Sequence, residues 1–233
     1  KSINMDLIAI ATNFRQMKGD WHIVHAAGIA AALSLFSRRY KYGVIASSFS
    51  YDSFDLNIPW GSNPLTDNLL SSKNFEIIND GSRYNRTDKL ELLINWQEAM
   101  DNMRVCWQGE KLDSNCCRCE KCIRVITSFY ALGMEPSKCF SLSITNQQIE
   151  NVIVPDLAIL FEYKCMLWKA KEKGIDAPWV KSLEKCIRLN EQRLHGKELL
   201  LKKIRRKIAV RTRLRKLYNS LNETINICEG AIK

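Results

Sequence analysis

The sequence lacks any apolar run as long as the roughly 18 residues that a membrane-spanning helix requires. Its N-terminal residues also lack the basic, apolar and small-residue order of a secretory signal peptide. These two absences argue against a membrane span and favour a cytoplasmic protein. The chain opens on Lys1 rather than Met, and an apolar stretch typical of a strand interior follows at once, so we expect a further segment upstream.

Cysteine, by contrast, is abundant, with nine residues in the chain. Without a secretory signal these thiols do not indicate a disulfide scaffold, because the cytosol keeps thiols reduced and clusters there more often hold a metal. Five of the nine lie between positions 106 and 122. This dense segment is therefore the main chemical signal of the sequence.

Four of these cysteines have the spacing of a metal site, since Cys106, Cys116, Cys119 and Cys122 form the pattern C-x9-C-x2-C-x2-C. A C-x2-C pair brings two thiolates to one tetrahedral ion from a tight turn, and the other two complete a closed site for structural zinc. Two alternatives stay open, an iron–sulfur cluster and a set of cysteines buried as small apolar residues. Cys117 is left over, and its side chain is expected to point away.

Positive charge accompanies the cysteines, because Arg118, Lys121 and Arg124 lie among them. We expect these side chains to offset the double negative charge of a four-thiolate zinc centre. A closed site of this kind has no open coordination position. Its metal is therefore expected to stabilise the fold rather than to take part in chemistry.

Short apolar runs alternate with helical patterns in the first part of the chain. Strands are expected over residues 5–12, 43–49 and 75–78, and helices over 24–36, 86–100 and 123–132. Strands that alternate with helices indicate an α/β fold with a parallel sheet covered by helices.

After residue 145 the pattern changes, and only helices are expected, over residues 147–173, 179–195 and 197–222. We therefore divide the chain into an α/β domain, 1–145, and an all-helical extension, 146–233. The extension is basic, with ten Lys and Arg residues from Lys197 to Lys216 against one acid, Glu198. Such a segment can bind nucleic acid, an acidic protein or an anionic membrane surface, or can simply be solvated.

Three motifs occur in a recognisable order: "TNFR" at 12–15, "GSNPLTD" at 61–67 and "NCCRCEKC" at 115–122. Together with the lysine-opened helix before the cysteines, and the helix after them that ends at Gly133, they resemble the C-terminal part of the N-type ATP pyrophosphatases. This PP-loop, or adenine nucleotide alpha-hydrolase-like, superfamily includes the 7-cyano-7-deazaguanine synthases, to which these features are similar. The resemblance covers about residues 5–140, and the cysteine spacing is its most specific part.

The resemblance implies a Rossmann-like (HUP-type) parallel sheet with a zinc knuckle, and a reaction that uses ATP and Mg²⁺. A carbonyl or carboxylate oxygen of a small-molecule substrate attacks the α-phosphate of ATP, which gives an adenylate and pyrophosphate, and a nucleophile such as ammonia then displaces AMP. Arg86 and Lys89 correspond to the expected phosphate contacts, and Arg15 lies where open α/β sheets place ligands. Each of the three can equally be a solvated side chain.

Two departures from the family weaken the enzyme interpretation. The Ser-Gly-Gly-x-Asp-Ser loop that holds pyrophosphate is absent, and none of the ten glycines adjoins another, so this loop either lies upstream or has been lost. In addition, Asn63 stands where relatives carry His, and Cys117 replaces a knuckle glycine.

Other polar and aromatic residues are weaker candidates. Asp67 and Asp80 can contact substrate or Mg²⁺, but ordinary turn aspartates explain them more readily. His22 and His25 open a helix, where capping or packing is the simpler explanation. Trp60 can support a planar substrate or anchor its own loop.

A second hypothesis assigns no catalysis to the chain. In it the protein is a zinc-dependent module that binds RNA or a protein partner through its basic C-terminal helices. A homo-oligomer is left open under both hypotheses.

Overall fold

The computed structural model describes residues 5–17, 19–53, 60–106 and 114–196. The chain divides into two compact units, residues 1–187 and 188–233. Of the second unit the structure describes only residues 188–196, which are helical. The basic segment 197–216 lies outside the described residues, so its helix and its partners stay predictions. No helix in the described ranges is long and apolar enough to cross a membrane.

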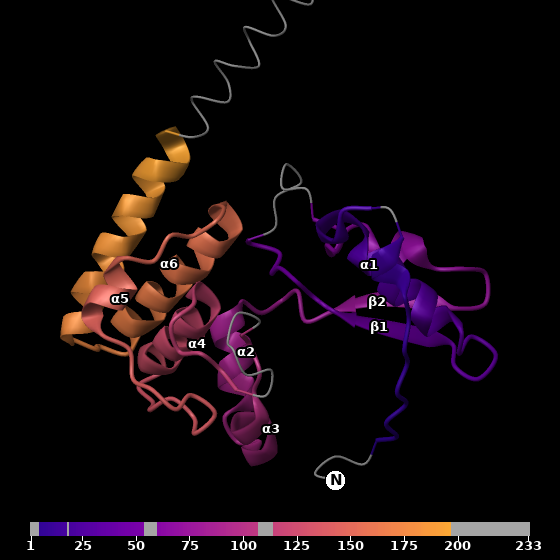
Figure 1. Ribbon diagram of the computed structural model, residues 1–233, viewed down its shortest axis with the longest axis horizontal. Helices are drawn as coiled ribbons and strands as arrows, with labels where there is room; N and C mark the ends of the chain where they lie inside the picture. The colour runs from indigo at the N-terminus through magenta and orange to yellow at the C-terminus, as the bar shows by residue number, and fades with distance from the viewer. Residues whose placement is uncertain (1–4, 18, 54–59, 107–113, 197–233) are drawn as a thin grey trace, which may run out of the picture. The chain divides into compact units, whose positions relative to one another are not determined.

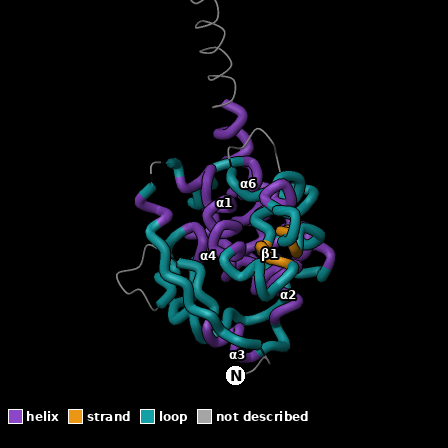
Figure 2. Tube along the Cα trace, turned by 90° about the vertical axis from the view of Figure 1, so that its right-hand side faces the viewer, coloured by secondary structure: helices purple, strands orange, loops and turns teal. Residues whose placement is uncertain are grey.

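Two short strands form a parallel pair, β1 (Tyr42–Ala46) and β2 (Glu76–Asp80). In their register Tyr42 lies opposite Glu76 and Ala46 opposite Asp80. The prediction of an α/β fold with parallel strands is confirmed at this level, and Figure 2 shows how small the strand portion is beside the helices. A larger Rossmann-like sheet is not formed by the described residues.

Helix α1 (Trp21–Ser34) covers one face of this strand pair (Figure 1). The Asp20 side chain caps its first turn by accepting a hydrogen bond from the His22 amide. Burial alternates along β1, as expected when one face of a strand packs on a helix. The resulting core consists of Ala30, Ile45, Phe75 and Ile77.

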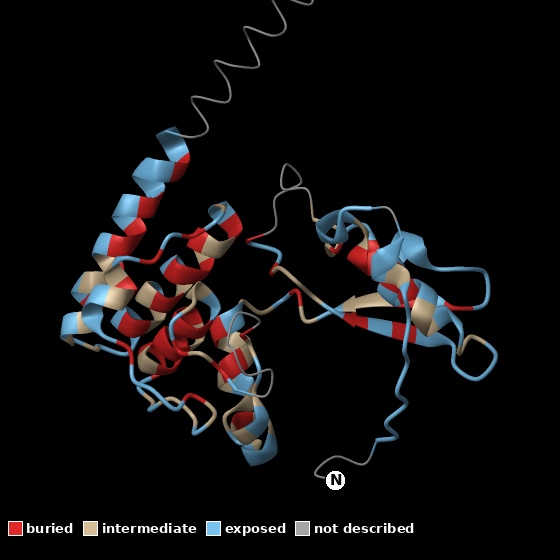
Figure 3. Ribbon diagram, in the orientation of Figure 1, coloured by how far each residue is buried: buried red, intermediate tan, exposed pale blue. Residues whose placement is uncertain are grey.

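The strand predicted over residues 5–12 is wrong. The segment has no regular structure and is exposed along its length (Figure 3). Leu7, for example, is 96% exposed. An apolar run becomes a strand only when its backbone pairs with a neighbouring strand, and no strand in the described part of the chain pairs with this segment. The motif that follows forms a short 3-10 helix, η1 (Phe14–Gln16).

The single helix predicted over residues 86–100 is divided into α2 (Arg86–Leu93) and α3 (Gln97–Asn102). Helix α2 begins with a capping box, in which the Asn85 side chain accepts a hydrogen bond from the Asp88 amide and the Asp88 side chain accepts one from the Asn85 amide. The break at residues 94–96 includes Asn95, whose residue type favours turns over helix interiors.

Helix α4 (Glu120–Ala131) follows the cysteines and confirms the helix predicted there. It packs against α2 and α6 (Leu157–Glu172), and many residues of these helices are buried (Figure 3). The predicted helix over residues 147–173 is divided into α5 (Asn146–Glu150) and α6, because Pro155 disfavours a helical conformation at the preceding residue. The domain boundary proposed at 145/146 stays a prediction.

Candidate metal centre and cation cluster

The structure brings the four predicted ligand cysteines together. The Sγ atoms of Cys106, Cys116, Cys119 and Cys122 all lie within 4.8 Å of one another. Cys106 arrives from the segment after α3, Cys116 from the knuckle loop, and Cys119 and Cys122 from the start of α4. Cys106 and Cys122 are buried, and the other two are partly exposed.

The sulfur separations fit one tetrahedral ion. The Cys119 and Cys106 sulfurs are 3.7 Å apart, and those of Cys116 and Cys122 are 3.9 Å apart. Four bonds of about 2.3 Å in tetrahedral directions place sulfurs about 3.8 Å from one another. None of the eight described cysteines forms a disulfide, so this cluster can hold a metal ion.

A backbone hydrogen bond and partial burial also affect the cysteine thiols. The Cys119 amide donates a hydrogen bond to Cys116 Sγ over 3.3 Å. Burial raises the pKa of the Cys119 and Cys122 thiols, so their charged forms are disfavoured unless a cation is present. A cation at the centre of the four sulfurs supplies that compensation.

Asn115 holds together the backbone segments around the four cysteines, and the sequence analysis did not identify this role. Its Oδ1 accepts hydrogen bonds from the Val105 and Cys106 amides, at 3.0 and 3.3 Å. Its Nδ2 donates to the carbonyls of Met103 and Cys139, at 2.8 and 3.2 Å. One buried amide thus uses two donors and two acceptors to join three backbone segments. Its place next to the first knuckle cysteine was the available signal.

Cys117 is outside the ligand set, as the spacing predicted. Its backbone has φ of 54°, in the left-handed region that favours glycine. Its buried side chain makes a long contact to the Asn115 carbonyl oxygen, at 3.6 Å. This conformation gives a physical reason for a glycine at this knuckle position.

The three basic residues near the cysteines divide into two groups. Arg118 and Lys121 are exposed on the knuckle. Arg124 is buried, and its Nε lies 3.4 Å from Glu120 Oε1 as an ion pair. The partner found for Arg124 is thus a carboxylate, and not a thiol as expected from the sequence.

A second polar site lies at the carboxyl ends of the parallel strands. Lys89, in the first turns of α2, donates hydrogen bonds from Nζ to Ser47 Oγ at 2.6 Å and to the Ser47 carbonyl oxygen at 3.2 Å. Ser47 follows β1 directly, and Gly81 follows β2. Open parallel sheets bind ligands at this edge.

Gly81 permits the approach of Lys89. Its φ of +86° lies in the left-handed region, and a Cβ there would come within 3.3 Å of Lys89 Cε. The turn predicted from "NDG" is therefore also the place where the lysine passes close to the backbone.

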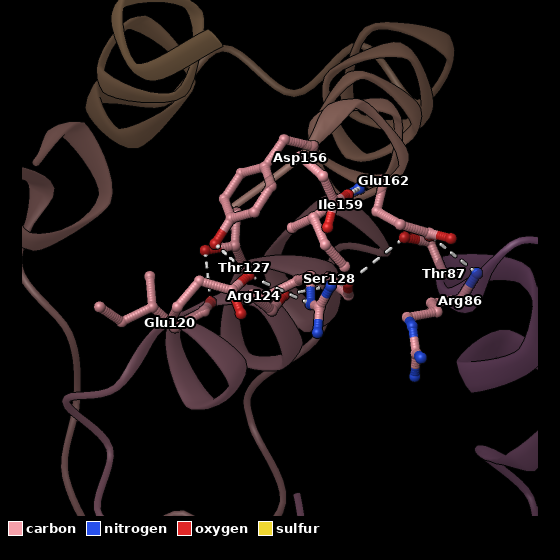
Figure 4. A network of polar contacts seen from close by, with 11 residues as sticks. Arg86, Thr87, Glu120, Arg124, Thr127, Ser128, Asp156, Ile159 and Glu162 are labelled. Atoms are coloured by element: carbon pink, nitrogen blue, oxygen red, sulfur yellow. Dashed lines mark hydrogen bonds and ion pairs between the residues drawn. The ribbon is translucent and has the colours of Figure 1, made fainter. Parts of the chain in front are cut away.

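Glu162 of α6 occupies the N-terminus of α2. Its Oε2 accepts a hydrogen bond from the Arg86 amide at 3.0 Å, although the two residues are 76 positions apart (Figure 4). With Asn85 and Asp88 in the capping box, the first amides of α2 are largely satisfied. An anion bound here would therefore be held by basic side chains rather than by the helix N-terminus that the sequence argument invoked.

Arg86, Lys89 and Arg124 form one cation cluster around Glu162. Desolvation by the surrounding protein, and then the nearby Arg124 charge, lower the pKa of Arg86, although part of this residue remains in contact with solvent and moderates the shift. Burial and the Arg86 charge lower the pKa of Lys89. Burial raises the pKa of Glu162 against the opposing effect of all three cations. The like charges of this cluster therefore disfavour one another in the folded protein.

Glu162 was not identified from the sequence. It lies inside the apolar helical pattern "LAILFEYKCMLW", where its side chain is only 3% exposed. An acidic residue on the buried face of a predicted helix was the available signal.

The remaining acidic candidates differ in their partners. Asp67 is fully buried and accepts hydrogen bonds from Ser62 Oγ, the Asn63 amide and Asn79 Nδ2. These bonds fasten its loop to β2. Asp80 is exposed at the end of β2 and favours the charged form of Lys89. Asp80, rather than Asp67, is thus the carboxylate free to meet a ligand or Mg²⁺ at this edge.

Arg15 is not brought to the cluster. Its guanidinium lies 4.8 Å from the ring centroid of Trp21 and stacks on it. The expected strand before it does not form, and no contact described in the structure joins it to Arg86 or Lys89. A nucleotide contact by Arg15 stays a prediction.

The other candidates pack around the start of α1. Trp60 lies against His22, His25 and Phe49, with ring centroids 5.1 to 5.8 Å apart. The Gly61 amide donates to the His22 carbonyl oxygen, which ties the loop to the helix. Asn63 Oδ1 accepts from the Leu65 and Thr66 amides and forms a local turn. These contacts favour loop anchoring for all of them.

No family model, no curated protein and no solved structure matches this chain.

Proposed function

We propose that this chain is a zinc-stabilised part of an ATP pyrophosphatase-like protein, in which Arg86 and Lys89 bind the phosphates of ATP. The observation that carries the proposal is that Lys89 reaches Ser47 at the carboxyl end of β1, with the Arg86 charge near enough to lower the pKa of Lys89. This edge is where α/β sheets bind nucleotides. The cysteine spacing and motif order of the sequence point to the same family.

Zinc is the metal that best fits the four sulfurs. Their separations agree with a single ion, whereas a cluster of several irons needs thiolates that are farther apart. With four protein ligands no position is left for substrate. Zinc would therefore hold the start of α4, and with it the packing of α4 on α2.

The residues of the strand edge would act by positioning and electrostatics. Lys89 and Arg86 would hold the phosphates and stabilise the charge of the departing pyrophosphate, while Asp80 would bind Mg²⁺. The substrate's carbonyl or carboxylate oxygen attacks the α-phosphate, and a nucleophile such as ammonia then displaces AMP from the adenylate. We assign no general acid or base among the described residues. Their expected contribution to the reaction is limited to binding the phosphates and Mg²⁺.

Calorimetric titration of the metal-loaded 233-residue chain with MgATP tests this function. Lys89→Ala should weaken binding at least about tenfold, because a charge-assisted contact to phosphate is lost. Lys41→Ala is the matched control, since Lys41 directly precedes β1, at the opposite end of the strand pair, and its loss changes the net charge equally. Equal losses in the two variants, or no binding by the unaltered chain, would contradict the proposal.

The alternative, a non-catalytic module that binds RNA or an acidic protein, rests on the composition of residues 197–216. It would be favoured by a chain that holds zinc, binds no MgATP, and binds RNA with a steep salt dependence.

A further inference from the structure

Arg124 is a buried cation whose hydrogen-bonding capacity is largely unused. The residue is 5% exposed, and within the described part of the chain neither Nε nor Nη1 has a hydrogen-bond partner. The ion pair with Glu120 is 3.4 Å long and is not aligned as a hydrogen bond. Glu120 also accepts a hydrogen bond from the Tyr163 hydroxyl, so its carboxylate is shared.

A buried guanidinium with few hydrogen bonds lowers the stability of the folded state. Buried charges are normally paired and hydrogen-bonded, and each unmade bond adds a desolvation cost. The network in Figure 4 includes Thr127 and Ser128 on the same helix, whose hydroxyls donate to the carbonyls of Ile123 and Arg124, and neither hydroxyl oxygen accepts from Nε or Nη1 of Arg124. The described residues therefore leave Arg124 short of an acceptor.

Arg124 lies in a cluster of three cations and two carboxylates, of which Glu120 and Glu162 are the acidic members. Its charge acts on Arg86, and Arg86 in turn acts on Lys89, so three cations surround the single buried carboxylate of Glu162. In Figure 4 the guanidinium groups of Arg124 and Arg86 extend to the same side of the network. A second anion on that side would meet both groups.

We propose that Arg124 is a ligand-binding residue, which reaches a phosphate group of the bound ligand together with Arg86. This inference rests on the proposed nucleotide site and extends it to the helix that carries the metal ligands. A guanidinium binds phosphate oxygens through several N–H donors that lie in one plane as a fork, and two of the Arg124 nitrogens have no hydrogen-bond partner among the described residues. Arg124 stands two residues after Cys122, so the metal centre fixes the turn that presents it.

The test uses inorganic pyrophosphate as the probe and calorimetric titration of the metal-loaded chain. Arg124→Met removes the charge and the fork, and should weaken binding at least about tenfold. Arg124→Lys keeps the charge without the fork and should give an intermediate loss. Arg118→Met is the matched control, because Arg118 is exposed on the same knuckle, and its binding should stay within about twofold of the unaltered chain. Thermal melts without pyrophosphate identify variants that fail to fold.

The outcomes separate this inference from the proposed function. Weakening in both Lys89→Ala and Arg124→Met supports both, whereas weakening in Lys89→Ala alone overturns the role of Arg124. Weakening in Arg124→Met alone supports Arg124 and overturns the assignment of Lys89. A chain that binds no pyrophosphate overturns both. If Arg124→Met does not fold, a folded Arg124→Lys variant that binds as tightly as the unaltered chain also overturns the inference.

Discussion

The candidate metal centre and the cation cluster both include the start of α4 but differ in how completely their polar groups are paired. At the metal centre four sulfurs converge, and Asn115 uses every donor and acceptor of its amide. In the cation cluster, Arg86, Lys89 and Arg124 share the Glu162 carboxylate, and two Arg124 nitrogens have no hydrogen-bond partner within the described residues. A site whose polar groups are all hydrogen-bonded within the protein stabilises the fold. A site with buried polar groups that lack such bonds is a candidate for binding a ligand.

The first turns of α4 belong to both regions. Cys119 and Cys122 contribute sulfurs to the metal centre, and Glu120 and Arg124 contribute charges to the cluster. Stability should therefore depend mainly on the first region, and ligand affinity mainly on the second. The following variants test that division.

The largest effect is expected from the loss of a metal ligand. Cys122→Ser should lower the free energy of unfolding by at least about 4 kcal/mol, or the melting temperature by about 10 °C, because metal-binding energy is folding energy in such sites. Thermal unfolding followed by circular dichroism measures the change. Cys165→Ser, which alters a free cysteine outside the cluster, is the control. Equal melting temperatures for the two variants would show that the four sulfurs hold no metal.

Asn115→Ala should come next, with a loss of about 3 kcal/mol. Four hydrogen bonds disappear, and the buried groups they served are left without partners. Urea unfolding measures this loss against Asn102→Ala, which removes an exposed hydrogen bond to the Glu98 carbonyl oxygen and should cost less than about 0.5 kcal/mol. Similar costs for the two variants would contradict the role assigned to Asn115.

The comparison of Gly81→Ala with Gly174→Ala isolates the contact with Lys89. Both glycines have positive φ, and each substitution should cost about 1 kcal/mol from backbone strain. A Cβ at Gly174 meets nothing within 4 Å, whereas one at Gly81 lies 3.3 Å from Lys89 Cε. Gly81→Ala alone should therefore weaken the binding of pyrophosphate as well. Unchanged affinity in Gly81→Ala would show that the position of Lys89 does not matter to the ligand.

The smallest effect is a pH dependence from Glu162. Its pKa in the folded chain is raised above the ordinary value of 4.5 by burial, so the folded state holds its proton to higher pH than the unfolded state. The contribution of Glu162 to stability therefore falls as pH rises from about 4.5 through the raised pKa. Glu162→Gln should lack this fall.

Urea unfolding of Glu162→Gln and of the unaltered chain, at several pH values between about 4 and 7, tests this prediction. This range includes the pH values just above 4.5, where the effect is expected. The stability of Glu162→Gln relative to the unaltered chain should rise with pH. Glu172→Gln, on the same helix but more exposed, supplies the baseline for the loss of one carboxylate. A relative stability that stays flat would indicate that Glu162 is not destabilised by burial.

The sequence was sufficient for features that depend on local pattern or spacing. The strands near residues 43–49 and 75–78, the helix after the cysteines and the convergence of the four cysteines all follow from such patterns. It failed where a distant partner decides the outcome. Residues 5–12 have an apolar pattern but no paired strand, and Glu162 reaches α2 from 76 positions away. The sequence placed Arg124 near the cysteines, but its burial and its ion pair with Glu120 could be found only from the structure.

The most direct test of the account is elemental analysis of the chain purified without added metal. The account predicts one zinc ion per chain in the unaltered protein and its loss in Cys122→Ser. Iron in multiple equivalents, or neither zinc nor iron, would contradict the claim that four sulfurs hold one structural zinc ion and thereby fix the start of α4.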